Sequence, residues 1–147
     1  MNEVVQFKVS GKPATAGSKR AFHHRHTGRI VVVDDCKGGK PWRKLVQAQA
    51  STKCRAPMVG PLRLAVIFVM PRPLSHRKKD GAIAKGAPQT HTVKPDATKL
   101  LRAVEDALTG IAWIDDAQIV EQHVSKRYAQ QDESPGALIA IAPLGEP

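Results

Sequence analysis

The arrangement of hydrophobic and polar residues along the chain predicts a series of strands interrupted by two helices. Apolar and polar residues alternate from Glu3 to Val9, as they do in a strand with one buried face. From Leu62 to Met70 nearly every residue is apolar, which is typical of a central strand. Shorter segments of β-like sequence predict further strands at residues 29–33, 117–124 and 137–142.

Two segments carry helical periodicity. The first runs from Pro41 to about Lys53. The second begins after Pro95, because a proline disfavours the helical conformation in the residue before it, so Asp96 suits the N-cap position. Gly110 ends this helix, whose apolar stripe consists of Leu100, Val104, Ala107, Leu108 and Ile111. We therefore expect an α+β fold, with a mixed β-sheet covered by two main helices, in a single domain of residues 1–147.

The charge balance indicates a polyanionic partner. The chain carries 23 Lys and Arg against 13 Asp and Glu, a net charge of +10. Phosphate neutralisation with counterion release would make such binding salt-dependent, although charge alone separates neither DNA from RNA nor an enzyme from a binding protein. The basic residues gather in two segments that we expect to be loops, near 18–29 and 71–93. The candidate nucleic-acid contacts are Lys19, Arg20, Phe22, Arg25, Arg29, Arg77, Lys78, Lys79 and Lys94.

Candidate chemistry is concentrated between Lys94 and Val120. Lys99 and Arg102 share one helix face and can neutralise a phosphate. If the strand that follows Asp116 lies against the helix N-terminus, Asp116 comes near Asp96, and the converging carboxylates would bind a hard cation such as Mg²⁺. The alternative is purely structural: Asp96 is then only a helix cap, and the Asp115-Asp116 pair is a solvated turn.

Seven short motifs follow one another in order along the chain. They are Gly11-Lys12-Pro13, Gly17 to Arg20, Pro41-Trp42-Arg43, Lys94-Pro95-Asp96, Leu100 to Val104, Asp106 to Gly110 and Asp115 to Val120. The motifs from Lys94 onward resemble the signature of RusA-type Holliday junction resolvases, and the N-terminal motifs resemble phage and prophage members of that family. The resemblance covers about residues 4–124.

The resemblance implies a RusA-like fold and a homodimeric endonuclease of DNA recombination and repair, which uses Mg²⁺ or Mn²⁺ to nick four-way junctions symmetrically. Asp96 matches the family's first carboxylate, Asp116 the late one, and Arg102 the catalytic cation, with Lys99 as its substitute. A threonine, Thr98, stands where a second carboxylate is expected. Asp115 is a better placed replacement ligand than Asp106, which lies roughly 12 Å along the helix from Thr98.

These observations leave two main hypotheses. The first is a metal-dependent junction resolvase that uses Asp96 and Asp116, and the second is a branched-DNA binding protein that does not cleave because Thr98 replaces a carboxylate. A basic nucleic-acid chaperone would leave the ordered aspartates unexplained. We expect no small-molecule cofactor, no signal peptide and no membrane span. Cys36 and Cys54 lack disulfide-framework spacing, so we expect free thiols in a bacterial cytoplasm, with phage or prophage origin implied by the resemblance.

Overall fold

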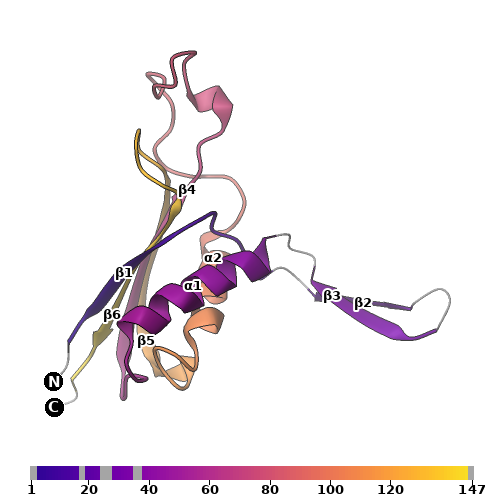
Figure 1. Cartoon of the computed structure of the whole chain (residues 1–147), viewed down its shortest axis with the longest axis vertical. Helices are drawn as coiled ribbons and strands as arrows, with labels where there is room; N and C mark the ends of the chain where they lie inside the picture. Colours follow the sequence, from indigo (N-terminus) through magenta and orange to yellow (C-terminus); the bar gives the residue numbers. More distant parts are fainter. Residues whose placement is uncertain (1–2, 17–18, 24–27, 35–37, 146–147) are drawn as a thin grey trace.

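The main sheet of the protein has four strands in the order β1-β6-β4-β5 (Figure 1). The computed structural model describes residues 3–16, 19–23, 28–34 and 38–145, and of residues 19–23 and 30–34 it describes the backbone alone. β4 pairs in parallel with β5 and antiparallel with β6, and β6 pairs antiparallel with β1. The sheet is therefore mixed, as predicted. Its strands are β1 (Val5–Ser10), β4 (Leu62–Met70), β5 (Ile119–Tyr128) and β6 (Gly136–Pro143).

Two helices, α1 (Gly39–Lys53) and α2 (Ala97–Leu108), pack against one face of this sheet (Figure 1). Alternate residues of β4 face them, so Leu64 and Val66 are buried in the same core as Trp42 of α1 and Val104 of α2. Arg63 and Ala65 are less buried, and Ile67 is exposed on the opposite face. One covered face and one open face confirm the α+β class and the two-helix cover.

The strand boundaries follow the sequence pattern closely, with two corrections. The predicted central strand at 62–70 is confirmed and lies between two neighbours. The strand predicted at 117–124 begins instead at Ile119 and extends to Tyr128. Its expected first residues form a short 3₁₀ helix, η2 (Asp116–Gln118), because the Asp115 carboxylate accepts a hydrogen bond from the Ala117 N–H and holds the turn.

The first basic segment is also corrected, because much of it is not a loop. Strand β2 (Lys19–His23) pairs antiparallel with β3 (Ile30–Asp34), and this hairpin projects from the body of the molecule (Figure 1). The density of basic residues in this segment had favoured the interpretation as a loop. The second basic segment, 71–93, is largely irregular, with one short 3₁₀ helix, η1 (Leu74–His76), and a bridge between Arg77 and Ile83.

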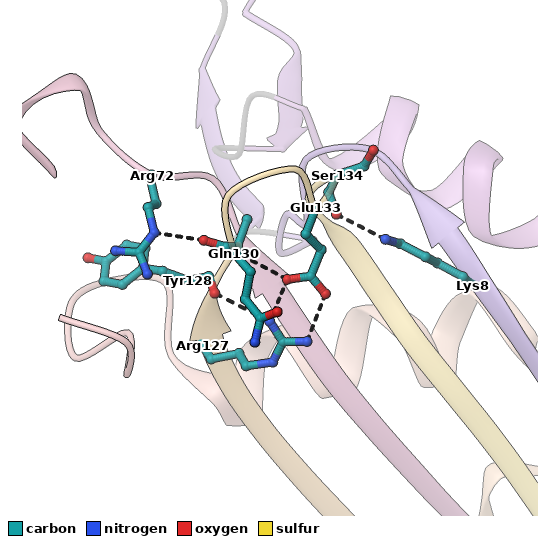
Figure 2. A network of polar contacts seen from close by, with 8 residues as sticks. Lys8, Arg72, Arg127, Tyr128, Gln130, Glu133 and Ser134 are labelled. Atoms are coloured by element: carbon teal, nitrogen blue, oxygen red, sulfur yellow. Dashed lines mark hydrogen bonds and ion pairs between the residues drawn. The ribbon is translucent and has the colours of Figure 1, made fainter. Parts of the chain in front are cut away.

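A polar network secures the turn between β5 and β6 (Figure 2). The Arg127 guanidinium donates to both carboxylate oxygens of Glu133 at 2.6 and 2.8 Å, and the Gln130 N–H donates to the same group at 2.9 Å. These contacts lower the Glu133 pKa from 4.5 to about 2, chiefly through the hydrogen bonds from Arg127. Arg72, which lies over the Tyr128 ring, donates to Ala129 O at 2.7 Å and so ties the 71–93 segment to this turn.

Candidate active site

The first candidate carboxylate, Asp96, stands at the N-terminus of α2. Its backbone is extended (φ −71°, ψ 144°), as an N-cap residue requires, and its C=O accepts the first helical hydrogen bond, from the Leu100 N–H. Its side chain, however, makes no capping hydrogen bond to the helix and is exposed. A purely capping role for this carboxylate is therefore wrong, and its oxygens face outward at the helix start.

A lysine that sequence reasoning missed lies beside this helix start. Lys126, near the end of β5, donates through Nζ to Val93 O at 2.6 Å and to Pro95 O at 2.8 Å. The ammonium group thereby fixes the segment that enters α2 and places a positive charge one residue from Asp96. No local pattern could reveal this contact, because the partners are 31 and 33 residues apart in the chain.

The second candidate pair, Asp115 and Asp116, has divided roles. Asp115 is the N-cap of η2, where its carboxylate and the Gln118 side chain form a reciprocal capping box. The structural interpretation of a turn-forming aspartate therefore holds for Asp115, whose Oδ1 is already engaged with the Ala117 N–H at 2.8 Å. Asp116 is half-buried and makes no such cap, so it is the member of the pair that remains available as a ligand.

Asp116 lies near a buried acid that the sequence analysis also missed. Glu105 of α2 is only 7% exposed, and its carboxylate accepts a hydrogen bond from the Gln122 side chain of β5. Burial raises the pKa of Glu105, and the negative charge of Asp116 raises it further. Asp116 begins η2, directly before β5, and therefore lies at the end of the sheet where α2 ends and β5 begins.

The expected approach of Asp116 to Asp96 is wrong within one chain. Asp96 precedes Glu105 by nine residues, which is about 14 Å along the helix at 1.5 Å per residue. The strand gives an independent measure, because Gln122 marks the Glu105 end and Lys126 the Asp96 end, about 13 Å apart at 3.3 Å per residue. The two aspartates thus lie at opposite ends of α2. Among the residues that the structure describes, no three His, Cys, Asp or Glu side chains converge on a common metal position.

The remaining predicted site residues occupy the exposed side of α2. Arg102 pairs with Asp106 one turn later, Nε to Oδ1 at 3.4 Å, in an ion pair that is largely open to solvent. Thr98 and Lys99 lie in the first turn of α2 and are exposed. Asp106, bound to Arg102 and two turns beyond Thr98, does not replace the missing carboxylate at the helix start.

Comparison with known proteins shows similarity over most of the chain. The family model described as "Endodeoxyribonuclease RusA" matches residues 11–142. The chain belongs to the RusA endodeoxyribonuclease family. It is also 29% identical over 132 residues to "Uncharacterized protein YqaN" of Bacillus subtilis (strain 168), an alignment that covers 88% of this chain and 91% of that protein. RusA proteins are endonucleases that resolve Holliday junctions, so the chain is of the nuclease class and its substrate class is branched DNA.

The basic side chains of the 71–93 segment and its end fall into two groups, those bound to the backbone and those exposed to solvent. Arg77 donates to Gly81 O at 2.8 Å and Arg72 to Pro88 O at 2.7 Å, so both guanidinium groups already bind the backbone of the 71–93 segment. The exposed basic side chains along this segment and at its end are Lys78, Lys79, Lys85 and Lys94. These four lysines are open to solvent, whereas Arg77, a predicted DNA contact, is bound to the backbone of the loop that carries three of them.

The other predicted DNA contacts belong to the β2-β3 hairpin. The backbone of Lys19, Arg20 and Phe22 lies in β2, and their side chains are outside the description. Arg25 lies outside the described residues, and Arg29 is exposed just before β3. The roles of these residues in DNA binding therefore stay predictions, now carried by a projecting hairpin (Figure 1).

A buried aromatic cluster supports the base of the 71–93 segment in this RusA chain. His91 is 7% exposed and meets the Tyr128 ring edge-on at 4.9 Å, while His76 meets the same ring at 4.7 Å. Burial lowers the pKa of His91, and the positive charge of Lys126 lowers it further. The contact between His91 and Tyr128 helps to hold the chain that leads to Asp96. None of the helices within the described residues is long and apolar enough to cross a membrane.

Proposed function

We propose that this chain is a metal-dependent endodeoxyribonuclease that resolves four-way DNA junctions by paired, symmetric nicks and acts as a homodimer. One observation supports this function above all: the family's first carboxylate, Asp96, begins α2 without capping it and is exposed. An aspartate that served the helix alone would turn its oxygens toward the N–H groups of the first turn. Asp116, the family's late carboxylate, is likewise not used as a cap.

The chemistry of these donors fits a hard divalent cation, Mg²⁺ or Mn²⁺, because carboxylate oxygens are the ligands such ions prefer. Their separation does not fit a site within one chain, since ligands of one Mg²⁺ lie about 2.1 Å from the ion and so within a few ångströms of one another. Asp96 and Asp116 can hold one ion only when they come from two copies. When bound, the ion would lower the pKa of a coordinated water and stabilise the charge on the phosphate.

The chain's own residues supply the remaining parts of the proposed reaction. Lys99 and Arg102, on the exposed side of α2, stabilise the negative charge that develops on the scissile phosphate. Lys126 fixes the backbone before Asp96 and keeps the carboxylate in position. The hairpin and the exposed lysines of the 71–93 segment bind the phosphates of the junction arms.

The test is cleavage of a labelled synthetic four-way junction beside a matched linear duplex, with Mg²⁺, with Mn²⁺ and with chelator. The wild-type protein should place paired nicks in the junction only when metal is present. Asp116→Asn should lower the rate by about a hundredfold or more, because even outer-shell changes at metal sites cost roughly 10- to 100-fold and this change removes a proposed ligand. Asp115→Asn is the matched control, since asparagine also caps a turn, and it should keep most of the activity. Metal-independent or absent nicking by the wild type would refute the proposal.

A second candidate function is a branched-DNA binding protein that does not cleave. The observation that favours it is Thr98, which places a neutral hydroxyl where the family pattern has a carboxylate. This protein would bind junctions selectively and with strong salt dependence, yet would nick none of them with either metal. Thr98→Asp separates the two: cleavage that appears only in the variant identifies a natural protein that binds without cutting.

A further inference from the structure

Gln118 ends η2, directly before β5, and its side-chain amide uses its whole hydrogen-bonding capacity. Oε1 accepts from the Ile114 N–H and from the Asp115 N–H, each at 3.1 Å. Nε2 donates to Met58 O and to Gly60 O, each at 3.0 Å. Because the four partners are two N–H groups and two carbonyls, a neutral amide satisfies them all, whereas a carboxylate, which only accepts, does not.

The two halves of this amide have different roles. Oε1 closes the turn, together with the bond from the Ala117 N–H to the Asp115 carboxylate, and these contacts form the capping box. A capping box requires nothing more from the residue at this position. Nε2 instead reaches 60 and 58 residues back along the chain, to the connection between α1 and β4. The second half of the amide therefore ties the turn to another part of the fold.

The connection that receives Nε2 is itself fixed to the body of the protein. The Met58 N–H donates to Ala112 O at 2.7 Å, and Met58 packs against the hydrophobic core. Two residues after Gly60, Leu62 begins β4 and pairs with Ile119, the first residue of β5. The turn before β5 is therefore anchored to the base of the central strand.

Asp116 lies inside the turn that these bonds hold. The preceding residue, Asp115, is bound to Gln118 through both its N–H and its C=O, which accepts from the Gln118 N–H at 3.0 Å. The C=O of Asp116 accepts a hydrogen bond from the Ile119 N–H. The Asp116 carboxylate takes part in none of these bonds. The backbone on either side of Asp116 is thus held in place, and its carboxylate remains available for a ligand.

We propose that Gln118 is a positioning residue for the candidate metal site, which acts by holding the Asp116 carboxylate where a divalent cation can bind. Hydrogen bonds that orient a metal ligand affect metal affinity or activity by roughly 10- to 100-fold, although the groups that make them do not touch the ion. The inference rests on the proposed function, in which Asp116 is a metal ligand. The alternative is that Gln118 stabilises the fold and has no effect on the metal.

The test is Mn²⁺ binding by the full chain, measured from the electron paramagnetic resonance signal of free Mn²⁺, beside the Mn²⁺ dependence of junction nicking. Gln118→Met keeps the length of the side chain but removes all four hydrogen bonds, and it should weaken Mn²⁺ binding by about 10- to 100-fold. Gln131→Met is the matched control. Gln131 likewise binds backbone groups through both ends of its amide, the Ile83 N–H at 2.8 Å and Gly81 O at 3.1 Å, but on the 71–93 segment. Its loss should leave the Mn²⁺ affinity unchanged.

A double-mutant cycle separates positioning from stability. In an Asp116→Asn background, Gln118→Met should weaken the residual Mn²⁺ binding little further, because the carboxylate that Gln118 positions is already gone. An equal loss in both backgrounds would show that Gln118 acts independently of Asp116, and the inference would be overturned.

A second variant, Gln118→Glu, keeps the test valid if Gln118→Met does not fold. Glutamate retains an acceptor for the Ile114 and Asp115 N–H groups, so the turn can close, but it loses both donors to residues 58 and 60. This variant should bind Mn²⁺ more weakly than the wild type, although its added negative charge favours a cation. Binding as tight as that of the wild type, or tighter, would overturn the inference.

The outcomes distinguish this inference from the proposed function. A wild type that binds Mn²⁺ more tightly than Gln118→Met but nicks no junction would refute the nuclease and keep the positioning role. A wild type that nicks junctions with Mn²⁺, beside a Gln118→Met variant that nicks as fast at every Mn²⁺ concentration, would keep the nuclease and refute the positioning role. A wild type that binds no Mn²⁺ would refute both.

Discussion

Mixing two inactive variants, Asp96→Asn and Asp116→Asn, tests whether the candidate site is shared between copies. The two aspartates lie about 13 Å apart or more within a chain, so a metal site that needs both must take one from each copy. Each variant alone should be inactive as a homodimer, because both of its sites lack a ligand. In a mixed dimer one site carries both substitutions, whereas the other retains Asp96 of one copy and Asp116 of the partner subunit.

The expected activity of the mixture follows from the fraction of sites that keep both carboxylates. After free exchange of an equal mixture, about half of the dimers are mixed, and half of the sites in each are intact, so about a quarter of all sites should be active. Each mixed dimer has a single working site. The products should therefore be junctions nicked on one strand rather than resolved duplexes.

The assay uses two different affinity tags, so that the mixed dimer can be purified after co-expression and given a labelled junction with Mg²⁺. The matched control pairs Asp96→Asn with the double variant Asp96→Asn, Asp116→Asn, a mixture in which no site keeps both carboxylates. Single-strand nicking by the first mixture alone establishes the shared site. The opposite result is a first mixture that is as inactive as the control while a mixed-tag wild type resolves junctions. Both carboxylates would then act within one chain, and the shared site inferred from their separation along α2 would be refuted.

Two further predictions address the basic loop and the turn between β5 and β6. Lys78→Ala and Lys79→Ala should each lower the slope of log affinity against log salt by about 0.9, with Lys53→Ala as a control away from the loop. Glu133→Gln should destabilise the fold by about 2 kcal/mol at pH 7. Since the folded pKa of Glu133 is depressed to about 2, its contribution is present above pH 4.5 and is lost as the pH falls toward 2, so denaturation curves of variant and wild type should converge there.

The local pattern of apolar and polar residues was sufficient to predict most of the helices and strands. The apolar run at 62–70 and the stripe of α2 are read directly from residue spacing, because burial of a strand or of a helix face repeats with the period of the element. Glu105 was also accessible in principle, since it lies four residues after buried Leu101 and three before buried Leu108. A charged residue at a buried position of a helix, such as Glu105, indicates a buried polar site.

The β2-β3 hairpin and the different roles of Asp115 and Asp116 were harder to predict. A dense run of basic residues lowers the apparent preference for a strand, so the pairing of residues 19–23 with 30–34 was hidden by charge. Both aspartates suit a turn by propensity. Only the three-dimensional arrangement shows that Asp115 holds the turn while Asp116 is left beside Glu105.

The separation of Asp96 from Asp116 follows from the topology itself. β4, α2 and β5 form a β-α-β unit with parallel strands, in which the helix must run back along the sheet before the second strand can start. A residue that begins the helix therefore lies at the carboxyl ends of the strands, and a residue that precedes the second strand lies at their amino ends. No change in loop conformation brings the two together within one unit. A metal site that needs both carboxylates therefore requires a second copy of the chain, which is why the proposed function includes a homodimer.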